Sequence, residues 1–323
     1  MKRNQIIDVA KFVAVAGVVF IHVAPSEGLA VCLTQITLQF AVPFFVITSL
    51  YFTLKGKVIS FKRIHFKRLL LPYVLWSIVY IALRLMKHSV IEDDRSWDVL
   101  GVVFFGKAAT GLYFIPMLIS YQIICVSVMN VLRWRSNAPM FNLFCFILVI
   151  FFVFLSISLK GTDYLGFNNL IIINALLYGF SAKVVDVFIT SKEYVLNRRV
   201  AIFLGLLVII LLCLANTYMM GLRLFTIPLM ASLLLSLCLI AKEIEVPPKL
   251  QKIAACSFGV YLTHTCFDQF YELLYVKFLG GVLPYMIVAK LVMWLVILIS
   301  STVFIYVLRQ YGWVRKFFIG ESR

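Results

Sequence analysis

The chain has 323 residues, 63% of them hydrophobic, and a mean hydropathy of +1.01. A soluble domain has roughly 45–50% apolar residues, so this composition excludes an ordinary soluble fold and favours a chain surrounded mostly by lipid. The net charge of +16 would favour nucleic-acid binding in a soluble protein. Here the charges lie in short loops between apolar segments, so we expect no nucleic-acid partner.

Apolar segments of about 20 residues, the length that crosses a bilayer as a helix, follow one another along the chain. We therefore expect an all-α fold, a polytopic membrane helix bundle of about ten transmembrane helices, in a single domain over residues 1–323. The first segment resembles a signal peptide, but Asp8 and Lys11 interrupt it, so we expect it to be retained. The expected spans are 6–25, 30–54, 70–87, 111–132, 140–159, 169–188, 199–218, 222–241, 254–272 and 281–308.

Within segment 98–110, residues Gly101 to Phe105 are apolar but too few to span, which is compatible with a re-entrant or interfacial piece. About twenty lysines and arginines fall on the side of the membrane that holds both chain ends, and about seven on the other. Because cytoplasmic loops carry the positive excess, we expect both termini to be cytoplasmic. The seven cysteines form no CxxC pair, which favours neither a disulfide framework nor a zinc site, so we expect no bound metal.

The first span carries three ionisable side chains, Asp8, Lys11 and His22. At about 100° and 1.5 Å per residue, Lys11 and His22 share one helix face about 16 Å apart, and Asp8 falls on the same stripe. Charged groups in a span are costly and usually face a polar interior with a function. In the alternative interpretation, Asp8 and Lys11 reach the headgroups and His22 is a packing histidine.

A basic cluster of Arg63, His65, Lys67 and Arg68 precedes the third span. The more frequent origin of such a cluster is the positive charge of cytoplasmic loops. The functional alternative is an anion site at the cytoplasmic mouth, because guanidinium groups bind phosphates with two hydrogen bonds.

The ninth span has a polar stripe, since Ser257, Tyr261 and His264 follow at i, i+4 and i+7, and Asp268 continues it. Such a stripe faces protein or water rather than lipid. Both a structural hydrogen-bond network and a functional site fit this pattern.

These motifs together resemble the acyltransferase type 3 family, the bacterial integral-membrane O-acyltransferases. The resemblance covers most of the chain, and its order makes it specific. The matching motifs are Asp8 with Lys11-x10-His22, Pro43-Phe44-Phe45 with Ser49, Lys67-Arg68 through Pro72-Tyr73, Leu112-Tyr113-Phe114, and Ser257-Phe258-Gly259-Val260-Tyr261-Leu262-Thr263-His264. The departures from the family pattern are His65-x-x-Arg68 in place of Arg-x-x-Arg, Leu50 rather than glycine after Ser49, and Gly111 where a histidine is frequent.

The resemblance implies a multi-pass enzyme of the bacterial cytoplasmic (inner) membrane that transfers an acyl group, usually acetyl, from cytoplasmic acetyl-CoA to a hydroxyl group. The acceptor would be a cell-surface or envelope saccharide or a glycolipid. His22 would be the catalytic base or a transient acyl carrier, and Lys11 with Asp8 would hold the polarity of the site.

The resemblance also implies that the cluster around Arg68, with Lys67, His65 and Arg63, binds the phosphates of coenzyme A. A hydroxyl group is a weak nucleophile near neutral pH and needs a base, and the tetrahedral oxyanion then needs hydrogen-bond donors. Lys11 is a poor candidate for such a donor, because it lies about 16 Å from His22 along the helix. Candidate donors that also contact the substrate are Ser49, Tyr113, Tyr261 and His264.

Other functions stay open from the sequence alone. A transporter or flippase of a glycan or anionic substrate would also need a polar path, although internal repeats, frequent in such proteins, are not found here. A structural scaffold would give the charges of the first span no purpose. Within the enzyme class, N-acylation or a longer acyl chain is also compatible with the sequence.

Overall fold

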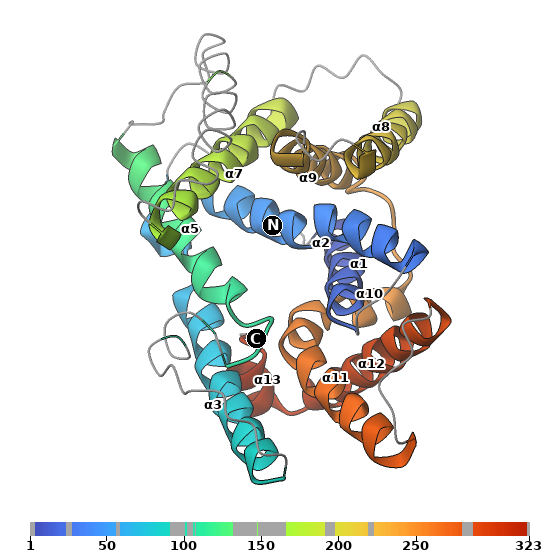
Figure 1. Cartoon of the computed structure of the whole chain (residues 1–323). Helices are drawn as coiled ribbons and strands as arrows, with labels where there is room; N and C mark the ends of the chain where they lie inside the picture. Colours follow the sequence, from blue (N-terminus) through green and yellow to red (C-terminus); the bar gives the residue numbers. More distant parts are fainter. Residues whose placement is uncertain are drawn as a thin grey trace. The chain divides into compact units, whose positions relative to one another are not determined.

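The structure is a computed structural model of the chain that describes residues 4–23, 28–55, 59–90, 101, 106, 108–131, 147, 166–190, 198–218, 223–279 and 287–321. Over these residues the regular secondary structure is entirely helical (Figure 1). The helices are α1 (Gln5–His22), α2 (Leu29–Leu54), η1 (Phe61–Arg63), α3 (Phe66–Val90), α5 (Phe114–Val131), α7 (Gly166–Thr190), α8 (Arg198–Tyr218), α9 (Arg223–Ile240), α10 (Pro248–Ala254), α11 (Ser257–Leu279), α12 (Ile287–Leu308) and α13 (Gly312–Phe318).

A helix covers most of each expected span in the described part of the chain. The expected span 140–159 lies outside the described residues except for residue 147, and most of segment 98–110 lies outside them as well. The expected start of α3 at residue 70 is wrong, because the helix already begins at Phe66 and includes Pro72. The expected start of the ninth span at 254 is also wrong, since α10 ends there and a turn separates it from α11.

Among the described residues, four helices are long and apolar enough to cross a membrane: Gln5–His22, Leu29–Leu54, Phe66–Leu85 and Ile287–Leu308. Shorter apolar helices are Phe114–Asn130, Ile202–Cys213 and Thr226–Ile240. The surface of α12 is apolar as well, with Val288, Val292 and Ile299 each more than half exposed. An apolar surface of this kind is compatible with lipid as the solvent.

The described contacts divide the chain into two compact units. The first unit consists of Met1–Ala14, Cys32–Ile64 and Ser120–Gln251, and the second of Val15–Val31, His65–Ile119 and Lys252–Arg323. Within the first unit, α9 packs against α7 and α8 (Figure 1). Within the second, α11 packs against α12, and α3 packs against α11 and α13. The residues of α1, α2, α5 and α10 are divided between the two units.

The beginning of α1 has a conventional cap. The side-chain oxygen of Asn4 accepts hydrogen bonds from the backbone N–H groups of Ile6 at 3.1 Å and Ile7 at 3.3 Å. These donors have no partner inside the helix, so the asparagine satisfies them and specifies where the helix begins.

The packing of α11 on α12 depends on a glycine. A Cβ atom on Gly259 would lie 2.6 Å from Cγ2 of Ile305, and Ile305 is completely buried. The absence of a side chain at position 259 therefore allows the two helices to approach closely at this point.

We predict that Gly259→Ala destabilises the protein. Overpacking costs about 1–3 kcal/mol and should outweigh the gain in helix propensity of about 1 kcal/mol. The measurement is thermal unfolding in detergent. Gly312→Ala is the control, because in the part of the chain that the structure describes a Cβ atom there would have no neighbour within 4 Å. A melting temperature of Gly259→Ala equal to that of the wild type would contradict the close contact.

Candidate active site

Two histidines meet in the second unit. His22 is the last residue of α1, and its ring centroid lies 5.3 Å from that of His264 in α11, with the rings tilted by 39°. His22 is half-buried and His264 is completely buried. The family motifs of the first and ninth spans thus contribute neighbouring imidazole groups.

The orientation of His264 follows from its hydrogen bonds. Its Nδ1 lies 2.7 Å from the backbone carbonyl of Tyr261. A carbonyl only accepts, so Nδ1 carries the hydrogen. In the neutral ring Nε2 is then an acceptor, and the Thr265 hydroxyl lies 3.4 Å from it. A neutral His264 therefore offers a lone pair at Nε2, and it would donate to an oxyanion there only after gaining a proton.

The loop before α5 lies against these groups. The Tyr261 hydroxyl donates a hydrogen bond to the carbonyl of Gly111, and the ring of Phe114 contacts that of Tyr261 edge to face at 5.6 Å. A Cβ atom on Gly111 would lie 3.3 Å from Cε1 of His264. Because the hydroxyl hydrogen of Tyr261 is used by Gly111, Tyr113, which is 48% exposed, is the more accessible of the two predicted tyrosine donors.

A buried lysine that the sequence analysis missed contacts α1 beside His22. Lys290 in α12 is 4% exposed. Its Nζ donates to the carbonyl of Val23 at 3.0 Å and lies 4.7 Å from the ring centroid of Phe20. The available signal was an ionisable residue within the last expected span, the same criterion that selected Asp8, Lys11 and His22.

Three other predicted residues lie in the first unit. Asp8 and Lys11 are half-buried in the beginning of α1, and Nζ of Lys11 lies 5.7 Å from the ring centroid of Phe52. Ser49 in α2 accepts a 2.6 Å hydrogen bond from Nε2 of Gln122, while the buried Oε1 of Gln122 has no hydrogen-bond partner among the described residues. Gln122 was not predicted, since a glutamine in an apolar segment gives little signal by itself.

The basic cluster is divided between the two units. His65, Lys67 and Arg68 are exposed in the second unit, at the beginning of α3. Arg63 lies in the first unit, where its guanidinium donates to the backbone carbonyl of Lys55. Arg63 thus already has a structural contact, whereas the exposed residues are accessible to an anionic ligand.

The segment that follows α13 lies against the backbone of Arg68. Pro72 has no N–H to donate to the Arg68 carbonyl four residues earlier, and that carbonyl faces Gly320. Gly320 has φ +70°, and a Cβ atom on it would overlap the Arg68 oxygen. Nε1 of Trp76 donates to the carbonyl of Phe318 at 3.0 Å. The first turns of α3 and residues 318–320 therefore support each other.

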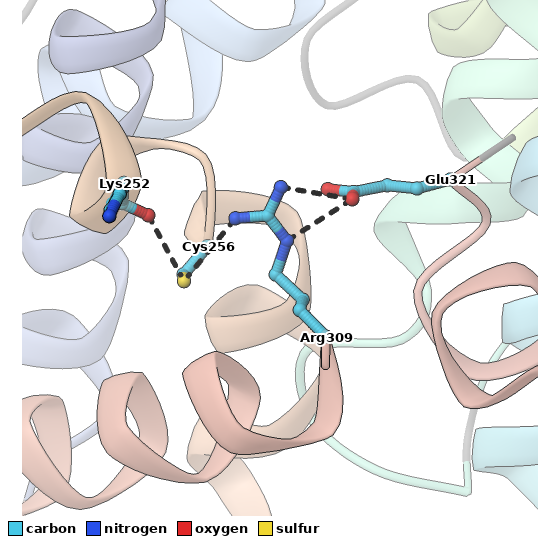
Figure 2. Close-up of polar contacts among 4 residues, drawn as sticks. All are labelled: Lys252, Cys256, Arg309 and Glu321. Carbon is cyan, nitrogen blue, oxygen red and sulfur yellow. Dashed lines mark hydrogen bonds and ion pairs between the residues drawn. The ribbon is translucent and has the colours of Figure 1, made fainter. Parts of the chain in front are cut away.

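An ion pair ties the same segment to the end of α12. Figure 2 shows Arg309 between Glu321 and Cys256, with Nε and Nη2 donating to Oε2 of Glu321 at 3.1 and 3.0 Å. Nη1 of Arg309 lies 3.8 Å from Sγ of Cys256, whose thiol donates to the carbonyl of Lys252. Burial raises the pKa of the Cys256 thiol, although the Arg309 guanidinium acts in the opposite direction. The Cys256 thiol thus joins α10 and the end of α12 through the Lys252 carbonyl and the Arg309 guanidinium.

Comparison with known protein families identifies the class of this protein. The acyltransferase 3 family model, described as an acyltransferase domain, matches residues 4–310. The chain therefore belongs to the acyltransferase 3 family and is a membrane acyltransferase, which confirms the resemblance inferred from the motifs. No curated protein and no solved structure shows a significant match to it.

We predict that Gly320→Ala destabilises the protein more than Gly28→Ala does. Both glycines have positive φ, but a Cβ atom on Gly28 would meet no atom of the described residues within 4 Å. Each alanine bears a left-handed backbone cost of about 1–2 kcal/mol, and only Gly320→Ala must also push its segment away from α3, at a further cost of about 1–3 kcal/mol. Equal shifts of the melting temperature in detergent would contradict the contact with Arg68.

Proposed function

We propose that this acyltransferase moves an acetyl group from cytoplasmic acetyl-CoA to a hydroxyl group of an envelope saccharide or glycolipid, with His22 as the general base. The observation that supports this role most directly is the contact between the ring of His22 and the buried ring of His264. An imidazole is the side chain best suited to take a proton near neutral pH.

The reaction balances with one base. His22 takes the proton of the acceptor hydroxyl as its oxygen attacks the thioester carbonyl. The tetrahedral intermediate collapses, the C–S bond breaks, and the new C–O ester bond remains. The coenzyme A thiolate then receives the proton from His22. A covalent acyl-histidine is the alternative course, and it would require two successive transfers.

His264 would assist His22. Its Nδ1 hydrogen is held by the Tyr261 carbonyl, so the ring has a defined orientation and presents Nε2 as an acceptor. Such a group can stabilise the protonated His22 that forms during attack, in the manner of a base oriented by a third group. The predicted donor role of His264 toward the oxyanion would apply only after this proton has moved.

We propose side-chain hydroxyl groups as the hydrogen-bond donors for the oxyanion. Tyr113 is exposed, and Ser49 accepts from Gln122, which leaves its own hydrogen for another acceptor. Tyr261 would act mainly through its contact with Gly111. Lys11 and Asp8 stay the proposed polar groups at the cytoplasmic end of α1, where both chain termini are also expected.

The donor would bind at the exposed basic residues at the beginning of α3. Coenzyme A is anionic and cytoplasmic, so its phosphates should meet the face with the positive excess. Arg68 is the main candidate because guanidinium binds phosphate with paired hydrogen bonds. Lys67 and His65 would add charge nearby. Arg63 stays a further proposed phosphate contact, in addition to its hydrogen bond to the Lys55 carbonyl.

We predict that His22→Ala and Arg68→Ala affect different steps. His22→Ala should lower kcat about 10²–10⁴-fold with unchanged acetyl-CoA affinity. Arg68→Ala should weaken acetyl-CoA binding about 10- to 100-fold, the effect of losing charged hydrogen bonds. The measurements are acetyl-CoA binding and thioester consumption by purified protein in detergent, with extracted envelope glycans as acceptor.

Lys316→Ala is the matched control for Arg68→Ala, because Lys316 is an exposed basic residue of the same unit. Lys316 is not among the proposed phosphate contacts, so removing its charge should leave the affinity within about twofold of wild type. If the wild-type protein bound a longer-chain acyl-CoA but not acetyl-CoA, the proposed acetyl donor would be contradicted. Equal losses in Arg68→Ala and Lys316→Ala would contradict a specific site.

A further inference from the structure

Lys290 and Asp268 are two ionisable residues, in α12 and α11, that the proposed reaction does not use. Lys290 lies in α12, the most apolar of the four candidate spans, and is 4% exposed. Asp268 is half-buried in α11. Ionisable side chains inside a bilayer are costly, and they are usually paired and functional.

The partner of Lys290 on α1 is the end of that helix. The last carbonyl groups of a helix have no donor within it, and lipid cannot supply one. Lys290 provides a donor to the carbonyl of Val23, the residue after His22, at 3.0 Å. A positive charge at a helix C-terminus also interacts favourably with the helix dipole.

Lys290 also contacts a residue that precedes His22 in the chain. Its Nζ lies 4.7 Å from the ring centroid of Phe20, within the range of a cation–π interaction. One turn along α12, Nε1 of Trp294 donates to the carbonyl of Ala16 at 2.7 Å. Contacts from α12 therefore hold the last two turns of α1, including the residues on both sides of His22.

The counter-charge of Lys290 comes from the helix that carries His264. Asp268 lies four residues after His264, on the same face of α11, and it interacts electrostatically with Lys290. Glu272 is a further acidic residue near Asp268. The face of α11 that presents His264 to His22 thus also places an acidic group near enough to interact with the buried ammonium group of Lys290.

We propose that Lys290, balanced by Asp268, is a positioning residue that holds the end of α1 so that His22 stays aligned with His264. This assignment deepens the proposed function, because it rests on His22 as the general base. Lys290 acts through the Val23 carbonyl and the Phe20 ring. The role therefore predicts a loss of turnover without a loss of donor binding.

The kinetic test compares Lys290→Met with wild type. Misplacement of a catalytic group by about 1 Å can cost about 10²-fold in rate, so kcat should fall about 10- to 100-fold while KM for acetyl-CoA changes less than about threefold. Lys290→Arg keeps a donor and a charge and should recover part of kcat. A wild-type kcat in Lys290→Met would overturn the proposal.

Two further variants separate positioning from general damage. Removing only Lys290 leaves Asp268 unpaired, which can prevent folding, so Lys290→Met combined with Asp268→Asn provides a neutral version of the pair. Lys183→Met is the matched control, since Lys183 is equally buried and pairs with Asp186 at 2.7 Å in α7. It should lower stability but leave the kcat of the folded protein near wild type.

A chemical measurement tests the position of His22 without depending on turnover. Diethyl pyrocarbonate modifies accessible imidazoles, and mass spectrometry gives the rate for each histidine. His22 should react about tenfold faster in Lys290→Met, because losing a charged hydrogen bond favours local opening of the helix end. The exposed His65 should keep its rate and serves as the internal reference.

The two measurements distinguish failure of this proposal from failure of the proposed function. If wild-type protein does not consume acetyl-CoA, the donor assignment fails, and the His22 modification rate decides the role of Lys290. An unchanged rate in both Lys290→Met and the double variant would overturn the positioning role. A faster rate that Lys290→Arg reverses would support it.

Discussion

The carbonyl groups of backbone segments that end or break inside a membrane need donors from the protein, because hydrocarbon offers none. In the second unit, long side chains supply these donors to segments far away in the sequence. The pairs are Lys290 with Val23, Tyr261 with Gly111 and Trp76 with Phe318. Trp294 and Tyr80 add a second donor to carbonyls inside helices, those of Ala16 in α1 and Leu262 in α11. The same contacts that satisfy the backbone also determine where the ends of α1 and α3 lie.

The geometry of the candidate site follows from this need for backbone hydrogen-bond donors. His22 is at the end of a helix whose carbonyls are bound by α12, and His264 is oriented by the carbonyl of Tyr261 in its own helix. At the beginning of α3, Pro72 removes one helix hydrogen bond, and Gly320 packs on the carbonyl that becomes available. Imidazole and guanidinium groups thus project from backbone whose polar groups are already satisfied, which favours a preorganised site.

Much of the helical architecture could be predicted from the sequence, because a span needs about 20 apolar residues and this signal is local. The start of α3 was misplaced because the apolar segment begins only after the basic residues Lys67 and Arg68, whereas the helix already begins at Phe66 and includes them. Lys290 was missed although its signal was local too. The contact of His22 with His264 could not be predicted from spacing, because it depends on how α1 and α11 cross. Ser257 lies on the same stripe as His264, but this spacing does not tell which nitrogen of His264 carries the hydrogen or which residue its ring contacts.

The side chain that fits at position 111 depends on the position of the His264 ring. The backbone of Gly111 lies so close to His264 that even a methyl group would touch the ring. A histidine, which is frequent at this place in the family, would put its first side-chain atom into this contact, and the His264 ring would have to shift by a few tenths of an ångström to admit it. An exchange of residue 111 with a relative would therefore have to carry the 108–113 loop and the facing turn of α11 together.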